Sequence, residues 1–136
     1  MADRDFTVEC WAYPMGNENP GRIINAWNTA TTGFASWEMY WQNGNTFGAQ
    51  FSSAGTAANA TLVSTTSWHG TYGTPQRNNW YHLALVRANS VFTFYVNGAS
   101  AGSNTQPSAY TLQIPNTLTI AARRSGASYV EPFNGC

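Results

Sequence analysis

The chain has 136 residues and a formal net charge of zero, and its six basic residues are all arginine. This length predicts one domain with a sizeable core. The scarcity of clustered cations argues against a nucleic-acid partner, and the absence of a long apolar run argues against a membrane span. The first residues, Met1 to Asp5, lack the basic and apolar regions of a signal peptide. Because only 9% of residues are charged, copies repel weakly, and we expect self-association or other protein partners.

In chain order, the sequence predicts ten short strands bounded by Gly, Pro, Asn or Ser. They are expected at residues 6–13, 22–27, 33–41, 46–51, 60–67, 80–88, 91–96, 99–103, 117–122 and 129–133. The dipeptides Asn43-Gly44 and Asn97-Gly98 tolerate positive φ and predict tight hairpins. No stretch shows a helical period beyond a turn or two. The pattern predicts an all-β, antiparallel two-sheet β-sandwich, with alternate residues of each strand in a shared core.

Five segments resemble a known family in both order and spacing: FTVECWAYP at 6–14, WYHLALVR at 80–87, FTFYVNG at 92–98, LTIA at 118–121 and FNG at 133–135. They resemble the laminin-G-like jelly-roll modules of the concanavalin A-like lectin/glucanase superfamily, above all the copies in phage and marine microbial structural proteins. The resemblance implies one jelly-roll domain over residues 1–136 that lacks the family's usual first and last strands. Either a neighbouring chain supplies these strands to open edges, or the sheet tolerates their loss.

The two cysteines differ in setting, because Cys10 shares the inward face of the first strand with Phe6, Val8 and Ala12, whereas Cys136 ends the chain. We expect free thiols rather than a disulfide. The resemblance implies a possible calcium site, because many laminin-G-like modules bind calcium, and Asp3 and Asp5 could contribute ligands to it. Since no acidic loop is present, neither a metal nor another cofactor is expected.

Glycoside hydrolysis is the enzyme activity to consider on this fold, and it needs two carboxyl groups about 5 to 10 Å apart. Glu9 and Glu38 lie in different predicted strands and could face each other. We expect instead that Glu9 bonds to backbone or pairs with an arginine, and that His82 is buried and hydrogen-bonded rather than a general base. The protein is therefore expected not to be an enzyme and to have no catalytic residues.

The segment 67–78 departs most from the family pattern, because it is a glycine-punctuated loop that carries two aromatic residues beside polar ones. Exposed rings beside amide and guanidinium groups suit sugars, so we predict a glycan-binding loop. Its ligand-binding residues are expected to be Trp68, His69, Tyr72, Gln76 and Arg77. The open alternative is that Trp68 and Tyr72 cap the sandwich or bury themselves against a neighbouring subunit. Trp27, Trp37 and Trp41 are expected in the core.

These observations predict a non-enzymatic recognition module that binds carbohydrate or mediates adhesion. The resemblance to phage modules implies a place in a virion or tail, or outside the cell. A self-assembling virion or filament subunit without a glycan ligand is the alternative, and a glycoside hydrolase is a more distant one.

Overall fold

The computed structural model describes residues 5–16, 20–28, 35–42, 44–52, 60–63, 73–105, 118–125 and 127–136. These residues form β-strands and contain no helix, hence none that could cross a membrane. The strands are β1 (Phe6–Ala12), β2 (Gly21–Trp27), β3 (Ala35–Gln42), β4 (Thr46–Ser52), β5 (Ala60–Val63), β6 (Tyr81–Ala88), β7 (Val91–Val96), β8 (Ala99–Thr105), β9 (Thr119–Ile120), β10 (Arg123–Ser125) and β11 (Ser128–Val130).

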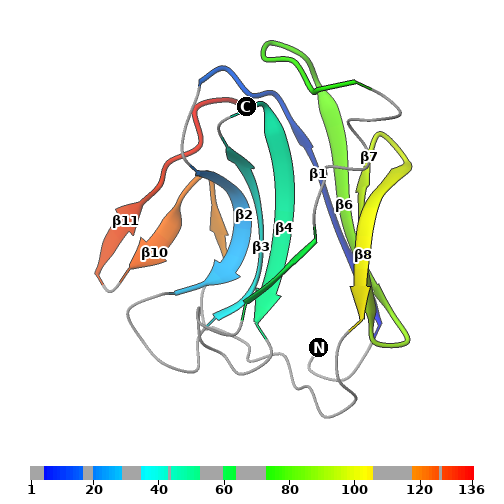
Figure 1. Cartoon of the computed structure of the whole chain (residues 1–136). Helices are drawn as coiled ribbons and strands as arrows, with labels where there is room; N and C mark the ends of the chain where they lie inside the picture. Colours follow the sequence, from blue (N-terminus) through cyan, green and yellow to red (C-terminus); the bar gives the residue numbers. More distant parts are fainter. Residues whose placement is uncertain are drawn as a thin grey trace.

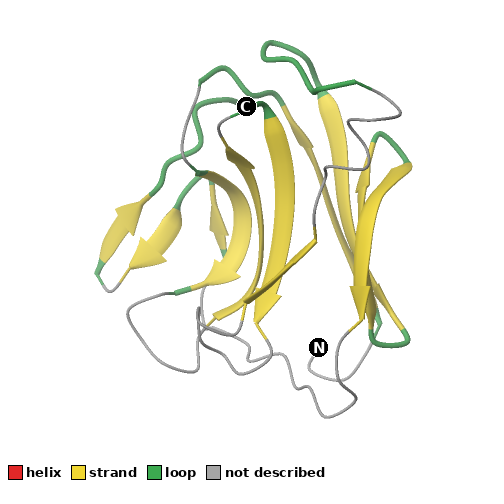
Figure 2. Ribbon diagram, in the orientation of Figure 1, coloured by secondary structure: helices red, strands yellow, loops and turns green. Residues whose placement is uncertain are grey.

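Two antiparallel sheets face each other in the sandwich (Figures 1 and 2). One sheet has four strands in the order β1-β6-β7-β8, and the other has five in the order β5-β4-β3-β2-β9. The hairpin β10-β11 lies beside β2, on the side of the five-stranded sheet that faces away from the other sheet (Figure 1). The predicted all-β, two-sheet sandwich is therefore confirmed.

The core lies between the two large sheets and follows the period of two that the sequence predicts. In β7, for example, Phe92, Phe94 and Val96 are buried and alternate with partly exposed residues. Aromatic rings join the layers: Phe51 of β4 stacks on Phe92 with ring centroids 4.0 Å apart. The other large core side chains are Ile23, Trp37, Met39, Trp41, Phe47, Tyr81, Leu83, Leu85 and Phe133. Trp37 and Trp41 thus confirm the prediction for the strand tryptophans, whereas Trp27 is buried outside this cluster.

Tight turns connect the central strands. Asn97 and Gly98 adopt φ values of 51° and 78° between the paired residues Val96 and Ala99, as the Asn-Gly dipeptide predicts. Between β3 and β4, Gln42 pairs with Thr46, and positive φ falls on Gly44 and Asn45. The second hairpin is confirmed, but its turn lies one residue later than the dipeptide indicated, and Asn43 lies outside the described residues.

The C-terminal part of the chain departs from the predicted strands. The predicted strand at 117–122 is reduced to the two residues of β9, because Ala121 adopts a left-handed φ of 61° and its N–H donates to the carbonyl of Ile23. A separate hairpin, β10-β11, follows, and the predicted strand at 129–133 ends early because Glu131 also has a positive φ of 52°. Left-handed conformations at Ala and Glu give no local sequence signal. Residues 33–34, 64–67 and 117 of the predicted strands lie outside the described residues.

Candidate functional site

The structure places two of the five predicted ligand-binding residues. Gln76 and Arg77 lie just before β6 and are exposed, whereas Trp68, His69 and Tyr72 lie outside the described residues. Gln76 lines a pocket of about 390 Å³, and Arg77 does not. Gln76 therefore shares a pocket with residues that the sequence did not mark as ligand-binding, whereas Arg77 does not line that pocket.

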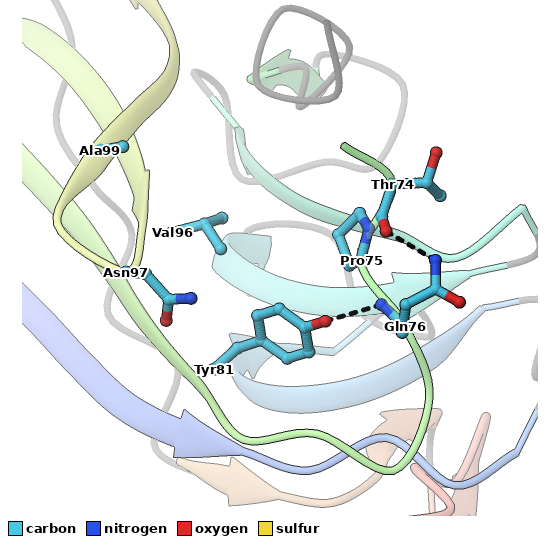
Figure 3. A pocket seen from close by; sticks show the side chains of 7 residues that line it. All are labelled: Thr74, Pro75, Gln76, Tyr81, Val96, Asn97 and Ala99. Carbon is cyan, nitrogen blue, oxygen red and sulfur yellow. Dashed lines mark hydrogen bonds between the residues drawn. The ribbon is translucent and has the colours of Figure 1, made fainter. Parts of the chain in front are cut away.

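The pocket lies between the segment before β6 and the turn that connects β7 to β8 (Figure 3). Its lining residues come from three places in the chain: Thr74, Pro75 and Gln76, then Tyr81 at the start of β6, and Val96, Asn97 and Ala99 at the β7–β8 turn. The segment before β6 is held to the sandwich by Asn78, whose N–H donates to the carbonyl of Pro14 at 2.8 Å. The tight β7–β8 turn places Asn97 on the opposite side of the pocket.

Hydrogen bonds hold both polar walls of the pocket. The backbone N–H of Gln76 donates to the Tyr81 hydroxyl at 2.6 Å, and Gln76 Nε2 donates to the carbonyl of Thr74 at 2.8 Å. Across the pocket, the backbone N–H of His82 donates to Asn97 Oδ1 at 2.9 Å, and the Asn97 N–H donates to the carbonyl of His82 at 2.8 Å. The amide groups are thus oriented before any ligand arrives.

The lining residues that the structure describes carry no charge. The half-buried Ala99, with the buried Pro75 and Val96, forms an apolar floor, while Thr74, Gln76 and Asn97 form an exposed polar rim. A rim of fixed amides over an apolar floor suits a neutral ligand that combines hydrogen-bonding groups with C–H or methyl surface. The sequence did not indicate Asn97 as a site residue. Its place in an Asn-Gly dipeptide is fully explained by the turn, so nothing pointed to a second role in a pocket.

A second polar cluster lies on the outward face of the five-stranded sheet, where it meets the β10-β11 hairpin. Arg22 Nη1 is 2.8 Å from Glu38 Oε1, and Arg22 Nε is 3.0 Å from Glu131 Oε2. Arg123 completes the cluster, since its guanidinium nitrogens lie 3.7 Å from Glu38 Oε1 and 2.7 Å from Glu131 Oε2. Gln50 also donates a hydrogen bond to Glu38. These contacts fasten the hairpin to the sheet.

Burial dominates the electrostatics of this cluster. Glu38 is 0% exposed, and its Oε2 atom has no hydrogen-bond partner among the described residues. Burial therefore raises the pKa of Glu38, while the positive charges of Arg22 and Arg123 and the hydrogen bond from Gln50 oppose the increase. Burial also raises the pKa of Tyr40, whose ring lies under the Arg22 guanidinium, to about 12.

The two carboxylates considered for glycoside hydrolysis do not form a pair. Glu9 is 65% exposed on the outer face of the four-stranded sheet, where its Oε2 lies 3.4 Å from Nε2 of His82. Glu38 lies on the outer face of the opposite sheet. The predictions for Glu9 and His82 are therefore wrong. Glu9 pairs with a histidine rather than with backbone or an arginine, and His82 is half-buried rather than buried. Both side chains point outward because their neighbours in β1 and β6 fill the core.

Other candidate sites are sparse in the described ranges. No group of three or more His, Cys, Asp or Glu side chains there could hold a metal ion. Asp5 accepts a hydrogen bond from the Asn89 N–H, and Asp3 lies outside those ranges. Cys10 and Cys136 are free thiols that line a common apolar groove of about 300 Å³, together with Trp11, Ile23, Ile24, Ile120, Ala121, Phe133 and Gly135.

Comparisons with known proteins agree with this architecture. A family model of laminin-G type, described as the concanavalin A-like lectin/glucanases superfamily, matches residues 1–136. No curated protein matches the sequence significantly. The family resemblance seen in the sequence is thus confirmed, while its narrower likeness to phage modules stays a prediction.

Solved structures with a similar fold share little sequence with the chain. The CBM40 of the Ruminococcus gnavus IT-sialidase, bound to α2,3-sialyllactose, has a TM-score of 0.73 at 12% identity, covering 98% of this chain and 72% of its own. A heptameric SAP-like pentraxin from Limulus polyphemus gives 0.67 at 19% identity, with 98% and 61% covered. Domain 4 of a GH43 extracellular arabinanase from Geobacillus stearothermophilus, in complex with arabinotriose, gives 0.64 at 14% identity, with 98% and 57% covered. At these identities the likeness shows the fold alone.

Proposed function

Because the chain belongs to the concanavalin A-like lectin/glucanases superfamily over residues 1–136, we propose that it is a non-catalytic carbohydrate-binding module. Its ligand site in this proposal is the pocket between the segment at 74–76 and the β7–β8 turn. The observation that carries the proposal is the neutral rim of hydrogen-bonded amides around an apolar floor. Sugars present hydroxyl and amide groups on C–H surface, and this pocket offers contacts to both.

Two further observations support a glycan ligand. The pocket volume of about 390 Å³ is within the range of small-molecule sites, which runs from roughly 300 to 1,000 Å³. Two of the similar folds carry sugars in their structures, sialyllactose in one and arabinotriose in the other. The fold hosts many activities, so the argument rests on the pocket, and the neighbours add only that this scaffold can present a sugar site.

The non-catalytic part of the proposal is supported by the positions of the carboxylates. Glu9 and Glu38 lie on opposite outer faces of the sandwich and cannot flank one glycosidic bond. Glu38 and Glu131 are both engaged by Arg22 and Arg123, so neither is placed as a free acid or base. Release of any product from a bound oligosaccharide, followed by chromatography, would contradict this part.

The experiment is a glycan panel followed by titration of each hit by two-dimensional NMR of the ¹⁵N-labelled protein. We expect saturable binding to at least one glycan, with the largest shifts at Gln76 and at the β7–β8 turn. The decisive variant is Asn97→Asp, because aspartate retains the acceptor for the His82 N–H and the Asp-Gly turn, yet removes both amide donors.

A matched control is Asn89→Asp in the β6–β7 turn. Asn89 also has a positive φ and is exposed, but it lies at the other end of β7, about 20 Å away along a strand of this length. We expect Asn97→Asp to lose binding and Asn89→Asp to retain it. The proposal fails if no glycan binds, or if both variants bind as the parent does.

Self-assembly is a second candidate, favoured by the open edge of β1. Among the described strands, β1 pairs only with β6, and its free edge lies beside the apolar groove and the exposed side chains of Trp11 and Ile120. A second copy could pair with this edge, since the formal net charge of zero opposes association little. The virion or filament role would belong to this candidate. A stable monomer in sedimentation at micromolar concentration would remove it.

A further inference from the structure

The hydrogen bonds inside the pocket decide which polar atoms are left for a ligand. Asn97 Oδ1 already accepts from the His82 N–H, so the amide is oriented with Nδ2 toward the middle of the pocket (Figure 3). No hydrogen bond among the described residues uses Asn97 Nδ2. Gln76 Nε2 donates to Thr74, and the Tyr81 hydroxyl accepts from Gln76. The inward-pointing group is therefore an N–H donor, which requires an acceptor oxygen on the ligand.

The apolar part of the pocket is small and aliphatic. Val96 is 0% exposed and Pro75 is buried, so a ligand reaches the aliphatic lining chiefly at the half-buried Ala99. Tyr81 is only 8% exposed, and its hydroxyl accepts a hydrogen bond from the Gln76 N–H. The described lining thus lacks the flat aromatic platform on which a sugar ring would stack. Its apolar surface matches a group the size of a methyl.

We propose that this pocket selects sugars that carry an acetamido substituent, an inference that rests on the proposed carbohydrate-binding function. The acetamido carbonyl accepts a hydrogen bond from Asn97 Nδ2, and the methyl group contacts the aliphatic floor at Ala99. An acetamido group carries a hydrogen-bond acceptor, the carbonyl oxygen, and a methyl group in one rigid plane. The pocket offers a partner for each, a donor for the oxygen and an aliphatic floor for the methyl. A hydroxyl at that position would satisfy the donor and leave the floor without a contact.

The charge of the lining adds a second constraint on the ligand. A carboxylate or sulfate group would find no cation among the described lining residues, and Arg77 lies outside the pocket. Burying an anion without a partner is unfavourable. The part of the sugar that enters the pocket is therefore neutral, and the acetamido group meets that requirement.

The test compares N,N′-diacetylchitobiose with cellobiose, which have the same linkage and differ at the acetamido positions. NMR titration of the folded parent protein should give a dissociation constant about fourfold lower for the acetylated disaccharide, the effect of one buried methyl group. Saturation-transfer experiments on the same sample should show the acetyl methyl as the most strongly saturated ligand group. Asn97→Asp should bring the two constants to within about twofold, and Asn89→Asp should leave the difference intact.

The outcomes separate this inference from the function on which it rests. Equal binding of the two disaccharides at the pocket would overturn the acetamido selection and leave the carbohydrate-binding function standing. The selection is also wrong if the acetylated sugar binds but the shifts of the parent protein map away from Gln76 and Asn97. Failure of every glycan in the panel would overturn both proposals. Because mapping and saturation transfer use the parent protein, they decide the question even if Asn97→Asp folds poorly.

Discussion

Replacement of Arg22 by methionine tests the charged cluster between β2 and the β10-β11 hairpin. Arg22 is buried and bonds to both Glu38 at 2.8 Å and Glu131 at 3.0 Å. Methionine fills a similar volume but leaves two carboxylates with Arg123 as their one remaining cation in the cluster. Removing one partner of a buried ion pair costs about 3–5 kcal/mol. For a domain of this length, that corresponds to a decrease in Tm of about 10–18 °C.

The loss should depend on pH with a defined sign. Burial raises the pKa of Glu38, so the folded protein holds that proton more tightly than the unfolded chain. The stabilising contribution of the neutral acid is complete below the pKa of an unfolded glutamate, about 4.3, and is lost as pH rises through the folded pKa. Because Arg22 opposes the shift, its removal raises this pKa further. The Arg22→Met penalty should therefore be larger at pH 8 than at pH 5.

Thermal unfolding followed by near-ultraviolet circular dichroism at both pH values measures these effects. The matched control is Arg77→Met, the same chemical change at an exposed arginine, which should alter stability by less than about 0.5 kcal/mol. Adding Glu38→Gln to Arg22→Met removes the unpaired charge and should restore most of the loss. The reasoning is refuted if Arg22→Met has the same Tm as Arg77→Met, or if the loss of stability caused by Arg22→Met is the same at pH 5 and pH 8.

Three further substitutions or reactions test packing and burial. Gly48→Ala should destabilise the protein by about 1–3 kcal/mol in urea unfolding, because a Cβ atom would lie 2.5 Å from Cζ of Tyr40; an unchanged midpoint would show that the ring moves aside freely. Phe92→Ala should cost about 3–5 kcal/mol, since its ring is buried and stacks at 4.0 Å on the facing sheet, and a loss below about 1 kcal/mol would contradict that packing. Burial raises the pKa of Cys10 to about 11, so iodoacetamide at pH 8 should modify the exposed Cys136 first, as read by peptide mass spectrometry; equal rates in the folded protein would disprove this.

The sequence alone determines the strands and the main turns of this protein. Alternation at Phe92, Phe94 and Val96 predicts the inward face of β7, and the structure buries all three. Asn97-Gly98 predicts the turn because positive φ at these two residues is a property of the dipeptide itself. Both signals are local, so neither needs knowledge of the neighbouring strands. The breaks at Ala121 and Glu131 carry no such signal, because their left-handed conformations depend on contacts with distant backbone.

The pocket and the charged cluster were decided only by the tertiary structure. Gln76 and Asn97 are 21 residues apart in the chain, and they line one pocket because β6 and β7 pair in a register that places Leu83 opposite Val96. Arg22 and Glu131 are brought together when β2 pairs with β9 and the chain then returns along the outer face of the sheet. The order of strands in a sheet depends on the packing of the whole core. The period of two along one strand indicates which side chains point inward, but not which distant side chains they meet.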